Sequence, residues 1–170
     1  ALPVRPARRA SSIEKAERAY CLLGDAFLAQ DNAVAAIEIY QGAARQFPDG
    51  LMRKHLPARI CRAYIKMGLH LMVERRLKTM SPDVLKSPDM RPVLLELARY
   101  RLEAGDPAST LALLNDPRWG NDSAADPEAL LLAARAHLAE GAVLAAIEKA
   151  ERAARLSADG PCRRDACVLL

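Results

Sequence analysis

The sequence is poor in aromatic residues and in the residues that favour β-strands. Aromatic side chains make up 4% of the 170 positions, although 51% of the positions are hydrophobic. Val, Ile and Thr are sparse, whereas Ala, Leu and Arg, which favour helices, dominate. The composition therefore predicts an all-α protein, and the chain is long enough for one domain with a hydrophobic core.

Several functional classes lack their usual signals. No apolar run approaches the roughly 18 residues that a membrane span needs, and no signal peptide is visible. The net charge of +4 is spread along the chain, without a run of Lys and Arg among aromatic residues, which argues against nucleic-acid binding. Nothing resembles a nucleophile elbow, a phosphate-binding loop or a metal motif. We therefore expect a protein that is not an enzyme and that has no metal or cofactor.

The four cysteines form neither a disulfide framework nor a zinc motif. Cys21 and Cys61 fall inside helical patterns, where a free cysteine behaves as a small apolar residue. Cys162 and Cys167 have no second pair and no nearby histidine to complete a metal site. Because free thiols favour a reducing compartment, we expect a cytoplasmic protein, with the periplasm as the alternative.

A break in the helical pattern recurs at a nearly constant interval. The breaks are Asp31, Gly68, Gly105 and Gly141. They are separated by 37, 37 and 36 residues, and an apolar-periodic segment precedes and follows each of them. The sequence therefore predicts four helix–turn–helix repeats, since a fixed period of this size is typical of a solenoid.

Each first helix of a repeat carries a small residue at the same position. The first helices are expected at 16–30, 54–68, 91–105 and 127–141, and the small residues are Gly24, Cys61, Ala98 and Ala134. A small side chain lets two helix backbones approach closely, so we expect all four to be buried between the helices of a pair. The second helix of the first repeat has an apolar stripe at helical spacing, made of Ala33, Ala36, Ile37, Tyr40 and Ala43 with Ala44.

Helix starts are indicated by capping residues. Asn32, Asp106 and Asp126 are predicted N-caps, the last two followed by proline at the first helical position. Ser11 with Glu14 has the pattern of a capping box, which predicts that the first helix begins there.

The first repeat resembles a tetratricopeptide repeat. The residues that carry the resemblance are Tyr20, Leu23, Gly24, Phe27, Ala36, Tyr40, Ala43 and Pro48. The second repeat keeps Tyr64 and Gly68, and the later two keep the small residue and the glycine. The resemblance implies a right-handed superhelical solenoid of about four repeats over 11–160, in which the first helices line a concave groove that binds a peptide segment of another protein.

The resemblance also implies which residues line the groove. They are Asp25, Leu28, Arg62, Ile65, Lys66, Arg99, Leu102, Arg135 and Leu138. Arg62, Arg99 and Arg135 would form a ladder suited to the carboxylates of an acidic peptide, with Asp25 as a negative end. The alternative is that each arginine pairs with a neighbouring carboxylate and only solvates the surface.

We accordingly expect a scaffold or chaperone-like module that binds a partner protein within an assembly. The alternative is a regulatory or substrate-docking domain of a larger enzyme or of a bacterial secretion or envelope machine. The composition is typical of a bacterial protein.

The flanking segments differ from the repeats. Residues 1–10 are rich in Pro and Arg and are expected to form a flexible arm. Residues 161–170 are expected to start a capping helix or a truncated fifth repeat, with Val168 and Leu170 packed on the preceding helices. The final CVLL also matches a prenylation signal, which is the alternative for this end. Trp119, in the longest loop, is expected to fasten that loop to the core, or else to anchor a partner.

Overall fold

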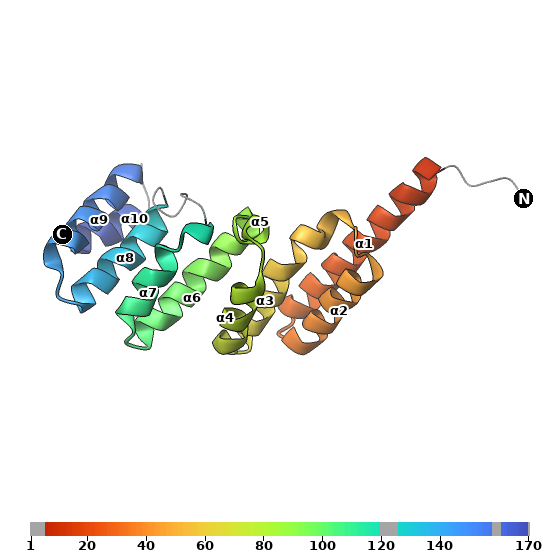
Figure 1. Cartoon of the computed structure of the whole chain (residues 1–170), viewed down its shortest axis with the longest axis horizontal. Coiled ribbons are helices and arrows are strands. Elements are labelled where there is room, and N and C mark those ends of the chain that lie inside the picture. Colours follow the sequence, from red (N-terminus) through yellow and green to blue (C-terminus); the bar gives the residue numbers. More distant parts are fainter. Residues whose placement is uncertain (1–5, 120–125, 158–160, 170) are drawn as a thin grey trace, which may run out of the picture. The chain divides into compact units, whose positions relative to one another are not determined.

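The computed structural model describes residues 6–119, 126–157 and 161–169, and these residues form helices and no strand (Figure 1). The predicted all-α class is confirmed. The chain divides into two compact units, 1–89 and 90–170. No helix in the described ranges is both long enough and apolar enough to cross a membrane.

Unit 1 contains two of the predicted helix pairs. Its helices are α1 (Pro6–Ala29), α2 (Ala33–Gln46), η1 (Leu51–Lys54), α3 (Leu56–Lys66), α4 (His70–Thr79) and α5 (Pro82–Leu85). The α1–α2 pair encloses a core around Tyr40, and α3 packs on α2 through Leu56 and Ile60. The Tyr20 and Phe47 rings pack edge to face, with 5.7 Å between their centroids. Of the predicted stripe on α2, Ala33, Ala36, Ile37, Tyr40 and Ala43 are buried, whereas Ala44 is exposed.

Unit 2 contains the other two pairs and one further helix. After η2 (Pro88–Met90), its elements are α6 (Arg91–Glu103), α7 (Pro107–Leu114), η3 (Pro117–Trp119), α8 (Pro127–Ala139), α9 (Val143–Leu156) and α10 (Pro161–Leu169). Trp119 is 6% exposed, so the indole is part of the packed interior, as expected for a residue that fastens its loop.

All four breaks adopt the same turn. The φ angles are +60° at Asp31, +71° at Gly68, +79° at Gly105 and +76° at Gly141. In each case the next residue donates its amide hydrogen to the carbonyl five residues earlier: Asn32 to Phe27, Leu69 to Tyr64, Asp106 to Arg101 and Ala142 to His137. This is the helix end that favours glycine, because L side chains are strained at positive φ.

The predicted caps and small positions agree with the structure. The carboxylate or amide oxygens of Asn32, Asp106 and Asp126 accept hydrogen bonds from backbone amides in the first turns of α2, α7 and α8. Gly24 is buried, and Cys61, Ala98 and Ala134 are each 0% exposed. The register inferred for the first helices is therefore confirmed.

The predicted capping box at the start of the chain is wrong. Helix α1 already begins at Pro6, so Ser11 lies inside it rather than at its N-terminus. Proline suits the first helical position, and residues 7–10 are Ala and Arg, which are strong helix formers. Residues 6–10 of the expected arm are thus helical, and residues 1–5 lie outside the described ranges.

The expected packing of Val168 is also wrong. Helix α10 packs on α8 and α9 through Cys162, Ala166 and Leu169, which share one face at helical spacing. Val168 is 86% exposed and Cys167 is exposed, because both lie off this face. Leu170 lies outside the described ranges.

Thiol burial gives a first testable prediction. Burial raises the pKa of the Cys61 thiol to about 11, so very little thiolate forms at pH 8, and Cys167 is the most exposed cysteine. We expect iodoacetamide at pH 8 to alkylate Cys167 rapidly and to leave Cys61 unmodified in the folded protein, as followed by peptide mass spectrometry. In urea both should react. Equal rates for the two thiols without urea would contradict the buried position of Cys61.

Candidate functional site

A pocket of about 380 Å³ lies between the two first helices of unit 1. Its lining residues are Asp25, Leu28 and Ala29 from α1, and Arg59, Arg62 and Lys66 from α3. Four of them, Asp25, Leu28, Arg62 and Lys66, are residues that the sequence placed in a groove. Because α1 and α3 belong to successive repeats, equivalent positions on the two helices come together here.

The Asp25 carboxylate is paired with residues of its own chain. Arg59 Nε donates to Asp25 Oδ1 at 3.0 Å and to Oδ2 at 3.3 Å. The Tyr40 hydroxyl donates to Oδ1 at 2.6 Å. Burial, followed by the hydrogen bond to Asp25, raises the pKa of Tyr40 well above its usual range, so this hydroxyl remains a donor at neutral pH. Asp25 is therefore not the free negative end that the sequence suggested.

Lys66 is also tied to α1. Its Nζ atom donates to the Leu28 carbonyl oxygen at 2.9 Å and to Asp31 Oδ1 at 2.5 Å. The ammonium group thus lies at the C-terminal end of α1, where the helix dipole favours a cation. The hydrogen bond from Lys66, followed by its charge, lowers the pKa of Asp31. The ion pairs of Lys66 and Arg59 therefore both connect α3 to the C-terminal part of α1, on opposite sides of the exposed Arg62.

Arg62 is different from these two cations. Arg62 is exposed, and its guanidinium group forms neither an ion pair nor a hydrogen bond among the residues that the structure describes. It lies on the same face of α3 as Arg59 and Lys66, at spacings of three and four residues. The pocket therefore presents one uncompensated guanidinium beside the apolar surface of Leu28 and Ala29.

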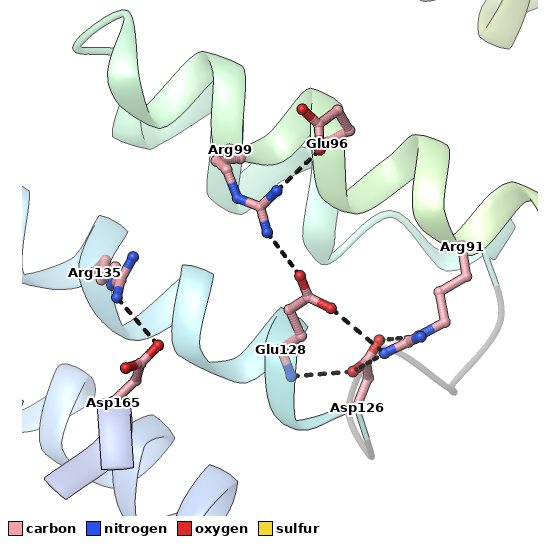
Figure 2. Close-up of polar contacts among 7 residues, drawn as sticks. All are labelled: Arg91, Glu96, Arg99, Asp126, Glu128, Arg135 and Asp165. Atoms are coloured by element: carbon pink, nitrogen blue, oxygen red, sulfur yellow. Dashed lines mark hydrogen bonds and ion pairs between the residues drawn. The ribbon is translucent and has the colours of Figure 1, made fainter. Parts of the chain in front are cut away.

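The matching arginine of the third repeat already has carboxylate partners (Figure 2). Arg99 Nη1 donates to Glu96 Oε2 at 2.9 Å, and Arg99 Nη2 donates to Glu128 Oε1 at 2.7 Å. Glu128 is in the first turn of the next first helix, α8, so Arg99 joins neighbouring repeats within unit 2. For Arg99 the alternative of pairing with nearby carboxylates fits the structure.

Arg135 also faces a carboxylate, though less closely. Its Nη2 atom is 3.8 Å from Asp165 Oδ2 of α10 (Figure 2). Among the apolar groove residues, Leu28, Ile65 and Leu102 are half-buried, and Leu138 is exposed. The ladder that would join Arg62 to Arg99 and Arg135 spans both units and stays a prediction.

Sequence reasoning missed Arg59. The available signal was its spacing of three residues from Arg62 on one helix face, together with a complementary Asp25 on the preceding first helix. Arg59 and Asp25 are 34 positions apart in the sequence, so their hydrogen bond forms only because α1 and α3 pack together in the fold.

The described residues contain no cluster of three or more His, Cys, Asp or Glu side chains that could hold a metal ion. No protein-family model, curated protein or solved structure matches the chain. The functional interpretation therefore depends on the residues of the site and on the resemblance of the first repeat.

Proposed function

We propose that this chain is a protein-interaction module whose first-helix face in unit 1 binds an acidic, partly apolar segment of a partner protein. The observation that carries the proposal is the uncompensated Arg62 guanidinium in a pocket of about 380 Å³ that is also lined by Leu28 and Ala29. A planar guanidinium suits a carboxylate, and the two alkyl side chains suit the apolar residue beside it.

The repeat architecture supports this proposal. Four helix pairs share one turn geometry and one buried small position, which is what tetratricopeptide-like repeats in a right-handed solenoid require. In such an array the first helices form a concave surface. We therefore place the partner segment on the side of unit 1 to which α1 and α3 contribute.

The proposed site is largely pre-organised. Arg59 and Lys66 are already held by Asp25 and Asp31, so their ordering adds little to the cost of binding. In unit 2, Arg99 and Arg135 face carboxylates of the same chain. We therefore expect the acidic residue of the partner to lie at Arg62, rather than toward the later repeats.

The test is a peptide selection on the folded chain followed by affinity measurement. Peptides enriched from a random display library should carry Asp or Glu next to an apolar residue. Their affinity, measured by fluorescence anisotropy, should fall roughly tenfold for Arg62→Glu, because one exposed attraction is lost and a repulsion replaces it. Raising the salt concentration should weaken binding to the wild type.

Arg75→Glu is the matched control, because Arg75 is exposed on α4 and does not line the pocket. It should leave the affinity unchanged. Circular dichroism should show that both variants keep their helical content. Equal binding of the selected peptides by Arg62→Glu and the wild type would refute the proposed site.

A further inference from the structure

A second pocket in unit 1 has the properties of a small-molecule site. Its volume is about 500 Å³, and it shares no lining residue with the pocket around Arg62. It is bounded by α2, η1, α3, α4 and the segment 81–84. Pockets that bind small ligands commonly have volumes of about 300–1,000 Å³ and combine an apolar surface with a few polar groups.

One part of this pocket is apolar. Leu56 and Ile60 of α3 line it from the packed interior, because they are only 2% and 4% exposed. The more accessible apolar lining residues are Ala44 of α2, Pro57 of α3 and Val84. An alkyl chain or ring of a ligand could therefore be removed from water here.

The other part is cationic and includes Arg76 of α4. The guanidinium carbon of Arg76 lies 5.9 Å from the centroid of the Tyr64 ring, in a cation–π arrangement. Its Nε atom is buried and has no hydrogen-bond partner among the described residues. A buried donor without an acceptor is unusual, and the guanidinium group that carries it has no carboxylate partner among the described residues.

No nearby group of the described chain compensates this charge closely. Arg76 forms no ion pair there, and Arg53, also in the lining, is 3.7 Å from the highly exposed Asp49. The thiol of Cys61 lies close enough to interact with Arg76, but its pKa of about 11 keeps it neutral. The lining contains three cations, Arg53, Lys54 and Arg76, and a single carboxylate, Asp83.

We propose that this pocket binds a small amphipathic carboxylate, such as a medium-chain fatty acid, with its carboxylate beside Arg76 and its alkyl chain on Ala44, Pro57 and Val84. The charge of the cationic part selects an anion, the apolar part selects a ligand with a hydrocarbon portion, and the volume matches a small molecule. This site is independent of the peptide site proposed above.

Octanoate is the probe, and octanol and inorganic phosphate are matched compounds that each lack one of its two features. In a ¹H–¹⁵N NMR titration of the full chain, octanoate should cause saturable shifts in amides of α3 and α4 around the pocket. Octanol and phosphate should each bind at least tenfold more weakly. Equal binding of octanol would refute the role of Arg76, and equal binding of phosphate would refute the apolar part.

Two variants test the location of binding. Arg76→Met should weaken octanoate binding at least tenfold, and Ala44→Leu should do the same by filling the pocket from α2, without removing a charge. Arg75→Met, on the same helix but outside the pocket, should bind octanoate as the wild type does. Absence of saturable shifts, or octanoate binding unchanged by Ala44→Leu, would overturn the proposal even if Arg76→Met failed to fold.

Discussion

Gly24→Ala should destabilise the protein by about 1–3 kcal/mol, although alanine is the better helix former. A Cβ atom at position 24 would overlap Cε1 of Tyr40 and lie 2.8 Å from both Cδ1 and Cζ of the ring. Tyr40 is 0% exposed and its hydroxyl is bonded to Asp25, so the ring has little freedom to move away. Urea unfolding followed by far-UV circular dichroism would measure the change.

Gly42→Ala is the matched control for this prediction. Gly42 is also inside a helix of unit 1, but an added Cβ there meets no atom within 4 Å. This substitution should stabilise the protein by about 0.5–1 kcal/mol, because alanine restricts the unfolded chain. If the two substitutions changed the free energy of unfolding in the same direction, Gly24 would not be a point of close helix contact.

The turns and the pairing of helices could be predicted because they depend on single residues. A helix end at positive φ favours glycine, so three of the four turns leave a direct mark in the sequence, and their spacing identifies the fourth at Asp31. The small residues that follow the same spacing could be placed for the same reason. Both kinds of residue can be read from single positions in the sequence, without knowing which helices pack together.

The first and last described helices were harder to predict, because the repeat pattern determines neither where α1 begins nor which face of α10 is buried. At Ser11 a capping pattern occurs inside a run of helix formers, and the helix continues through it from Pro6. Val168 was predicted to be buried because the period of the four repeats was assumed to continue into α10. The face of α10 is instead set by Cys162 and Ala166, which contact α8 and α9.

The candidate site could be predicted only in part. The face of α3 that carries Arg62 and Lys66 follows from helical spacing, and so does its position next to Asp25 and Leu28 of the preceding repeat. Whether an arginine is free or paired cannot be predicted from helical spacing, because the partner of Arg99, Glu128, is 29 residues away in the sequence. The second pocket could not be predicted, since η1 and α5, which help to form it, have no periodic pattern.

Asp126→Ala should destabilise the protein by about 2–4 kcal/mol, because Asp126 has two structural roles in unit 2 (Figure 2). Its side chain is 7% exposed, and its two oxygens accept hydrogen bonds from Arg91 Nε at 2.5 Å and Arg91 Nη2 at 2.6 Å. Its Oδ1 atom also accepts the backbone amide of Glu128 at 3.1 Å, which caps α8. The alanine variant loses both the cap and the bidentate pair.

Asp126→Asn separates these two roles, because asparagine is also a good N-cap but carries no charge. We expect it to lose about half as much stability as Asp126→Ala. Glu151→Gln is the control, since Glu151 forms an exposed pair with Arg155 on α9 and should change stability by less than about 0.5 kcal/mol. Trp119, the single tryptophan, is buried in unit 2, and its fluorescence reports the unfolding of that unit directly. If Asp126→Ala unfolded at the same urea concentration as Glu151→Gln, Arg91 and Asp126 would contribute no more than an ordinary surface pair.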